Sequence, residues 1–218
     1  MSLRKTAALA ALLWLVLAGA AFAQRAAPYT LLNPPQPTEP GKIEVIEFFW
    51  YACPHCYHLE SAAATWAKNT PKDVVFRRVP AAAGSWATLA TVFYTLESMG
   101  LLEQYHTKVF DAIHKEGLNL GNPSVRDEWL TKQGIDLAKY HSVEKSFAVM
   151  TKVQRAKQMT VSYKIDAVPQ LVVDGKYVVS AESAGGQERM FQAVDQAVAT
   201  ARREKTASTG TSPELVKR

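Results

Sequence analysis

The two cysteines of this sequence are the residues whose type and spacing most directly suggest chemistry. Cys53 and Cys56 are separated by Pro54-His55, and no other cysteine occurs among the 218 residues. A thiolate is a nucleophile, and two thiols at this spacing can cycle between a dithiol and a disulfide. A disulfide across so short a ring constrains little of the unfolded chain, so it would stabilise the fold only slightly. The pair is therefore predicted to be redox-active rather than structural.

Half of a zinc site is the main alternative for this pair, because zinc also binds cysteines at this spacing. A complete site needs further ligands, yet the sequence has no second CxxC pair and no two histidines spaced as HxxxH. The remaining candidate ligands are His58, His106, His114 and His141. Their spacing does not favour a metal, so we expect neither a metal nor any other cofactor.

The residues around the pair predict which cysteine reacts first. Residues 43–50 are rich in β-branched, aromatic and aliphatic side chains, as in a buried strand, and helical spacing of apolar residues begins at Cys53. At the start of a helix, free backbone N–H groups and the helix dipole favour an anion. Cys53 is therefore expected to be the exposed nucleophile with a low pKa, and Cys56, one turn further along, to be the resolving thiol.

The two residues between the cysteines indicate the direction of the reaction. Pro54 is tolerated in the first turn of a helix. His55 can supply a positive charge or an N–H donor near Cys53, which would stabilise the thiolate and hence the reduced protein. A couple whose reduced form is stabilised is a stronger oxidant. The motif thus favours donating disulfides over reducing them.

The first residues carry a pattern typical of export. A basic stretch at residues 1–5 is followed by an apolar run at residues 6–20 and by Ala21-Phe22-Ala23. We expect a signal peptide at residues 1–23, cleaved after Ala23, and a periplasmic mature protein. Without Arg4 and Lys5 the formal charge falls from +5 to +3, because 23 Lys and Arg then face 20 Asp and Glu. So mild a charge, without a basic cluster, does not favour a nucleic-acid partner, and no later run is long enough for stable membrane insertion.

Periodicity and composition divide the rest of the chain into elements. The expected strands are residues 29–32, 43–50, 74–79, 170–173 and 176–180, and the expected helices are residues 53–68, 86–99, 102–116, 125–133, 143–163 and 187–203. The expected organisation is a signal peptide (1–23), an N-terminal segment with a Pro-rich connector (24–42), a first α/β part with the CxxC (43–80), a helical insert (81–150), a second part (151–203) and a disordered tail (204–218).

Three sequence features together resemble the bacterial periplasmic DsbA family of the thioredoxin superfamily. They are Glu47-Phe48-Phe49, the run Cys53-Pro54-His55-Cys56-Tyr57, and Val168-Pro169 beyond a helical insert. The resemblance covers about residues 29–203. It implies an α/β protein with a thioredoxin fold and an inserted all-helical subdomain.

The resemblance also implies roles for further residues and a partner. It implies that Pro169 is cis, that Glu47 is a buried acid beneath the active site, and that a quinone-linked membrane oxidase of the DsbB type reoxidises the protein. The bulky neighbours of Glu47 support burial, and such a carboxylate could accept the proton of Cys56. Arg78 takes the place of a basic residue near the site in the family, although a surface arginine is an equal alternative.

The expected function is that of a monomeric periplasmic thiol:disulfide oxidase. It would donate the Cys53–Cys56 disulfide to reduced exported proteins through a mixed disulfide on Cys53. Val168 and Pro169 would present a backbone edge to which an extended client segment can add without side-chain specificity. A reductase or isomerase of the same fold, and a periplasmic chaperone without redox function, are the alternatives.

Overall fold

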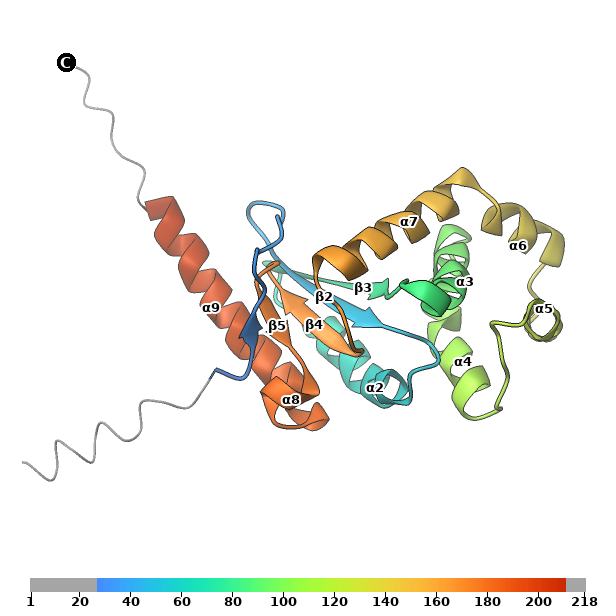
Figure 1. The fold of residues 1–218 in the computed structure, drawn as a ribbon, viewed down its shortest axis with the longest axis horizontal. Helices are drawn as coiled ribbons and strands as arrows, with labels where there is room; N and C mark the ends of the chain where they lie inside the picture. Colours follow the sequence, from blue (N-terminus) through green and yellow to red (C-terminus); the bar gives the residue numbers. More distant parts are fainter. Residues whose placement is uncertain (1–26, 211–218) are drawn as a thin grey trace, which may run out of the picture.

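The computed structural model describes residues 27–210, and these form a mixed sheet with helices on both faces and a group of helices beyond one end (Figure 1). The expected signal peptide, its cleavage after Ala23 and residues 211–218 lie outside the described residues. Within residues 27–210, no helix combines the length and the apolar composition needed to cross a membrane.

The sheet has five strands in the order β1-β5-β4-β2-β3. They are β1 (Thr30–Leu31), β2 (Ile43–Phe49), β3 (Val74–Pro80), β4 (Gln170–Val173) and β5 (Tyr177–Val179). β2 pairs in parallel with β3, and the other neighbours are antiparallel. The five strands expected from the sequence are thus confirmed, and the first is a short edge strand.

The centre of the sheet leads directly to the two cysteines. Six of the seven residues of β2 are buried, as its apolar composition predicts. The chain turns after Trp50 and enters α2 (Pro54–Lys68), for which Cys53 is the N-cap residue and Pro54 the first helical residue. β3 follows α2, so the expected strand–helix–strand unit is confirmed.

Helices cover both faces of the sheet. On one face, Val45 of β2 packs in one cluster with Leu59 of α2 and with Met190 of α9 (Met190–Gly210). On the other face, the ring of Tyr163, which follows α7 (Phe147–Ser162), lies 5.2 Å from the ring of Phe48. Cys53 and Cys56 lie where α2 meets the helical end of the molecule, in the larger core cluster.

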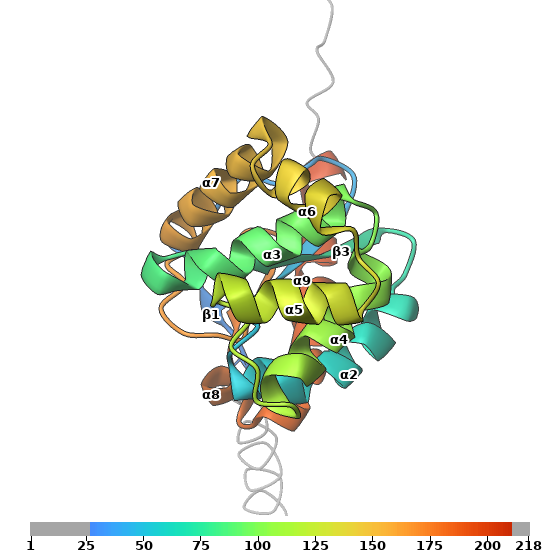
Figure 2. The same cartoon turned by 90° about the vertical axis from the view of Figure 1, so that its right-hand side faces the viewer.

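The helical insert is built around α3, which packs against α4, α6 and α7 (Figure 2). Its helices are α3 (Ala87–Ser98), α4 (Leu102–His114), α5 (Pro123–Lys132) and α6 (Leu137–Glu144), preceded by a short 3-10 turn at Gly84–Trp86. α4 also contacts α2 and therefore links the insert to the helix that carries the cysteines.

The prediction of a single helix at residues 143–163 is wrong, because the structure has two helices there. α6 ends at Glu144, and α7 starts after Ser146, whose side chain accepts a hydrogen bond from the N–H of Val149. Apolar periodicity continues through this break, so periodicity alone did not reveal it. The expected boundary of the insert after residue 150 falls inside α7, which packs along α3.

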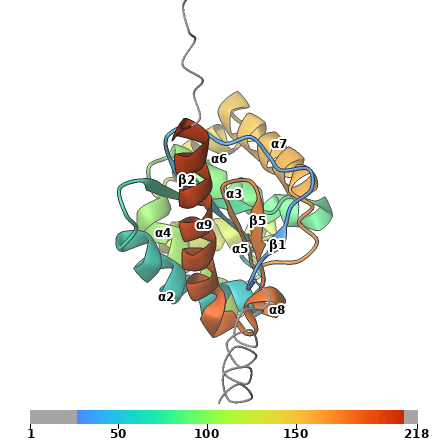
Figure 3. The same ribbon diagram turned by 90° about the vertical axis from the view of Figure 1, so that its left-hand side faces the viewer.

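The disordered tail expected from residue 204 is also wrong in its first part, since α9 continues to Gly210 (Figure 3). The buried side chains of Ala197 and Ala201 keep α9 against the sheet. One turn later, Glu204 pairs with Lys176 at 2.9 Å. The polar composition of this turn reflects its exposed position on a helix rather than a lack of structure. The sequence also missed the short α8 (Ala181–Ala184), and the helix expected from residue 187 begins as a 3-10 turn at Gln187–Arg189 before α9.

Candidate active site

Both thiols lie at the start of α2, and each is more enclosed than its sequence position indicates. Cys53 is 8% exposed and Cys56 is 1% exposed, and neither is disulfide-bonded in this structure. The expectation that Cys53 is openly exposed is wrong in degree, because the loop before β4 lies against it. Cys53 is still the more accessible of the two sulfurs, as expected from the sequence.

Hydrogen bonding makes Cys53 the acidic thiol. The Cys56 thiol contributes most, followed by the backbone N–H groups of Cys56 and His55 and then by the charge of His55, and together these overcome burial and lower the pKa of Cys53 from 9.0 to about 6. The sequence favours His55 as the group that stabilises the Cys53 thiolate, whereas in the structure the charge of His55 is the smallest of these contributions. Cys53 is mostly a thiolate at neutral pH.

Cys56 has the opposite character. Burial is the main cause that raises its pKa well above the ordinary thiol range, and the neighbouring Cys53 and the charge of Glu47 act in the same direction. Cys56 therefore holds a proton at neutral pH. When the disulfide opens, Cys56 leaves with the electron pair, and its raised pKa means that it takes up a proton from a nearby group and ends as a thiol.

Glu47 is a buried acid whose charge acts on Cys56, and it is the candidate for this proton donor. It is 1% exposed, and burial raises its pKa from 4.5 to about 7, although Arg78 opposes this shift. Arg78 lies opposite Glu47 in the parallel register of β2 and β3, with its Nε 3.2 Å from Oε2 of Glu47. The Arg78 side chain is only 20% exposed, so the surface alternative for this residue is not what the structure shows.

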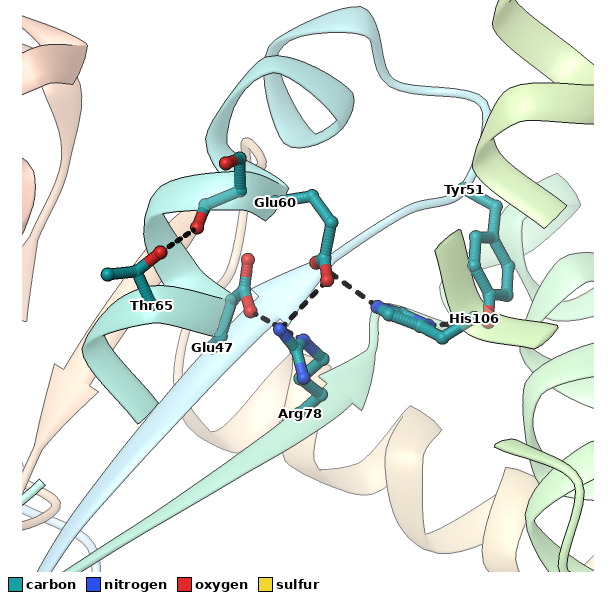
Figure 4. A network of polar contacts seen from close by, with 7 residues as sticks. Glu47, Tyr51, Glu60, Thr65, Arg78 and His106 are labelled. Atoms are coloured by element: carbon teal, nitrogen blue, oxygen red, sulfur yellow. Dashed lines mark hydrogen bonds and ion pairs between the residues drawn. The ribbon is translucent and has the colours of Figure 1, made fainter. Parts of the chain in front are cut away.

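Arg78 extends the contact to residues that sequence reasoning missed (Figure 4). Its Nη2 lies 3.1 Å from Oε1 of Glu60 on α2, and Oε2 of Glu60 lies 3.2 Å from Nε2 of His106 on α4. Nδ1 of His106 is 2.8 Å from the hydroxyl of Tyr51. In the sequence, Glu60 is one residue within the helix expected at residues 53–68, and His106 is only a candidate zinc ligand. No local signal connects residues 46 positions apart.

The loop before β4 completes the surroundings of Cys53. The Val168–Pro169 peptide is cis, as the family resemblance implies. Sγ of Cys53 lies 3.3 Å from the carbonyl oxygen of Val168, to which Cys53 donates a hydrogen bond when its thiol is protonated. Pro54 and His55 are exposed beside this contact, and the His55 carbonyl accepts a hydrogen bond from Gln187. An extended segment of another protein that reached Cys53 would thus lie beside the backbone of Val168.

The described part of the chain contains no group of three or more His, Cys, Asp or Glu side chains that could hold a metal ion. The groups of this site that carry its chemistry are the two sulfurs, the buried Glu47 and the charged contacts around Arg78.

Fold and site together define a class of protein. A thioredoxin-like fold with a dithiol at the start of the helix that follows its central strand is the framework of a thiol:disulfide oxidoreductase. Comparison with known proteins gives the family. A model of the DSBA-like thioredoxin domain matches residues 64–197, a range that begins after Cys56.

Two relatives and two solved structures extend the match over most of the chain. The thiol:disulfide interchange protein DsbA of Azotobacter vinelandii is 46% identical over 158 residues, 72% of this chain and 74% of that protein. The DsbA of Bordetella parapertussis is 42% identical over 83% of this chain and 88% of its own length. A crystal structure of Pseudomonas aeruginosa DsbA has a TM-score of 0.77 and 40% identity over 83% of this chain and 95% of that one. The crystal structure of DsbA from Xylella fastidiosa has a TM-score of 0.73 and 29% identity, over 80% of this chain and 95% of that one. This chain belongs to the DsbA family and is a thiol:disulfide oxidoreductase.

Proposed function

We propose that this protein is a periplasmic thiol oxidase that passes a Cys53–Cys56 disulfide to reduced exported proteins. The observation that carries the proposal is the asymmetry of the two thiols. The outer sulfur has a pKa of about 6, whereas the inner one is buried and protonated at neutral pH. Cys53 is the sulfur that clients attack because Cys56 is buried beneath it, and the stabilised Cys53 thiolate is a good leaving group in the exchange that follows.

The reaction is two successive thiol exchanges. A client thiolate attacks Sγ of Cys53, the Cys53–Cys56 bond breaks, and Cys56 leaves with the electron pair. A second client thiolate then attacks the client sulfur of the mixed disulfide, so a client disulfide forms and Cys53 leaves as a thiolate. Two client thiols are oxidised, and the protein is reduced to its dithiol.

Glu47 serves the inner sulfur in both directions. Because its pKa is about 7, it holds a proton in part of the molecules at neutral pH and can give it to the departing Cys56. When the dithiol is reoxidised, the Cys56 thiol must lose its proton before it forms the disulfide, and the ionised Glu47 accepts it. Val168 and Pro169 offer the backbone edge for an extended client segment next to Cys53.

The surroundings of the reaction complete the proposal. We infer from the basic, then apolar N-terminal sequence that the protein is exported and cleaved after Ala23. We infer further that it acts as a monomer and that a quinone-linked membrane oxidase of the DsbB type restores its disulfide. A reductase or isomerase is less favoured, because the stabilised Cys53 thiolate opposes net reduction of client disulfides.

Trapping of mixed disulfides tests the division of labour. In a Cys56→Ser variant the remaining thiol is first converted to a glutathione mixed disulfide and then mixed with a reduced, unfolded client. With a client that carries a single cysteine, we expect a covalent complex through Cys53 that persists, since neither Cys56 nor a second client thiol is present to resolve it. Cys53→Ser, treated identically, should give little complex because Cys56 is buried. Efficient trapping through Cys56 would overturn the assignment, and a chaperone without redox function would give no covalent complex with either variant.

A further inference from the structure

A buried row of polar side chains joins the insert to the carboxylates beneath the cysteines (Figure 4). It runs from Tyr51, in the turn before Cys53, through His106 of α4 and Glu60 of α2 to Arg78 of β3. Tyr51 is 1%, His106 6% and Glu60 7% exposed. Buried polar groups are costly unless they are hydrogen-bonded, so a row that spans four parts of the fold needs an explanation beyond packing.

The direction of each hydrogen bond follows from the chemistry of the groups. The Glu60 carboxylate can only accept, so Nε2 of His106 must donate to it. Nδ1 then accepts from the hydroxyl of Tyr51, at 2.8 Å. One neutral tautomer of the imidazole satisfies both contacts, and burial lowers the pKa of His106, which also favours the neutral ring. Glu60 therefore sets the tautomer of His106, and the hydroxyl of Tyr51 supports it by donating to Nδ1.

The two carboxyl groups are held unequally. Arg78 is the cation that pairs with both, through Nε to Glu47 and through Nη2 to Glu60. Glu60 also receives the N–H of His106, whereas burial is the leading influence on Glu47. Two carboxylates that share a cation in a buried site tend to retain a proton between them, and the carboxylate with more donors is the one that stays ionised.

We propose that His106, oriented by Tyr51, is a positioning residue that keeps Glu60 ionised and so assigns the shared proton to Glu47. Glu47 is the carboxyl group whose charge acts on Cys56. The assignment of the proton is independent of the reaction, while its use by Cys56 rests on the function proposed above.

The charged and titratable groups that face this pair come from several elements. They are Arg78 from β3, His106 from α4, Cys56 from α2, Tyr51 from the turn after β2 and, through Tyr51, Tyr140 from α6. Of these, Arg78 is a permanent cation that pairs with both carboxyl groups, so it does not decide which of them carries the shared proton. The hydrogen bond from His106 to Glu60 distinguishes the two.

Carboxyl resonances of the two glutamates test the proposal directly. The disulfide form, with ¹³C-labelled glutamate, is titrated by NMR, which removes the thiols from the titration. Glu47→Gln and Glu60→Gln variants assign the two signals. In the unmodified chain we expect Glu47 to titrate near neutral pH. Titration of Glu60 instead of Glu47 in that range would overturn the proposal.

Variants of His106 separate hydrogen bonding from packing. In His106→Leu, which removes the donor to Glu60, the midpoint of Glu47 should fall by about one pH unit. His106→Gln keeps an N–H donor and should restore the original assignment. If His106→Leu does not fold, Tyr51→Phe, which leaves the ring of His106 but removes its orienting hydroxyl, should give a smaller shift in the same direction. Unchanged midpoints in the folded variants would contradict the proposal.

A second measurement distinguishes this proposal from the function on which its use depends. The pH profile for resolution of a Cys53 glutathione mixed disulfide by Cys56 is compared in the unmodified chain and in His106→Leu. A profile that moves with the Glu47 midpoint supports both the role of His106 and the proton transfer between Glu47 and Cys56. Moved carboxyl midpoints with an unmoved profile would support the role of His106 and overturn the proton transfer between Glu47 and Cys56.

Discussion

At the scale of single residues, the thiolate of Cys53 depends mainly on its partner sulfur. The Cys56 thiol and the N–H groups at the start of α2 stabilise the charge, while the positive charge of His55 contributes least. The backbone donors of α2 would remain after substitution of either side chain. The acidity of Cys53 is thus largely a property of the helix start and of Cys56.

This ranking predicts different effects for two substitutions. Cys56→Ala should raise the pKa of Cys53 strongly towards the ordinary thiol value, because the largest stabilising contact is lost. His55→Ala should raise it in the same direction by less. Thiolate absorbance in the ultraviolet, followed against pH, measures both. A larger effect of His55→Ala than of Cys56→Ala would show that charge, not hydrogen bonding, controls Cys53.

The raised pKa of Glu47 predicts how stability depends on pH. A carboxyl group whose folded pKa is raised contributes stability below its unfolded pKa and loses that contribution as pH rises through the folded pKa. For Glu47 the window runs from about 4.5 to about 7. Relative to Glu47→Gln, the disulfide form of the unmodified chain should lose roughly 2 to 3 kcal/mol across it, since each pKa unit corresponds to ~1.4 kcal/mol.

Urea unfolding of both proteins at pH 4.5 and pH 8 would measure this difference. Glu44→Gln is a suitable control on the same strand, because the Glu44 side chain is 24% exposed and pairs with Arg77 outside the site. It should not reproduce the loss. Equal pH dependence of the unmodified chain and Glu47→Gln would be incompatible with a buried, protonatable Glu47.

At the scale of elements, the loop before β4 is the place where we propose that clients approach Cys53. β4 begins to pair at Gln170, opposite Phe48, so Val168 and Pro169 lie just outside the paired sheet. Pro169→Thr would add a backbone N–H next to the carbonyl that faces Cys53. We expect mixed disulfides with clients to persist longer, as a slower final exchange in stopped-flow or quenched reactions. Thr160→Val, on α7 away from the cysteines, is a control for the loss of stability alone, and unchanged exchange by Pro169→Thr would remove the loop from the site.

The elements also show how far sequence patterns reach. The five strands and the start of α2 follow from apolar composition and from Pro54 at a helix start, and both are confirmed. The break between α6 and α7 depends on the N-cap hydrogen bond of Ser146, which competes with a continuous apolar period. The contact of His106 with Glu60 depends on α4 packing against α2, which no local pattern encodes.

At the scale of the whole molecule, the acidity of Cys53 predicts which redox form is more stable. A folded pKa of about 6, below the ordinary thiol value, contributes stability that is fully present above the unfolded pKa and is lost as pH falls through 6. The disulfide form has no thiolate and lacks this contribution. At pH 7 to 7.5 only part of this contribution is present, and the short disulfide ring stabilises little, so the reduced protein should be the more stable form there by roughly 1 to 2 kcal/mol.

Denaturant unfolding of the two redox forms at pH 7.5 and at pH 5 would measure the difference and its loss in acid. Glu47 is present in both forms, so its own pH dependence largely cancels in the comparison. Greater stability of the disulfide form at neutral pH would be inconsistent with an oxidase.

The oxidising character of the Cys53–Cys56 couple is the central claim, and its equilibrium with glutathione tests it most directly. The protein is brought to equilibrium in buffers of known glutathione ratio at neutral pH, and the reduced fraction is measured after acid quenching and thiol labelling. We predict that the dithiol dominates until the buffer is strongly oxidising, with a reduction potential above about −200 mV. A potential near that of thioredoxin, about −270 mV, or below it would contradict the account, because such a couple would reduce client disulfides rather than form them.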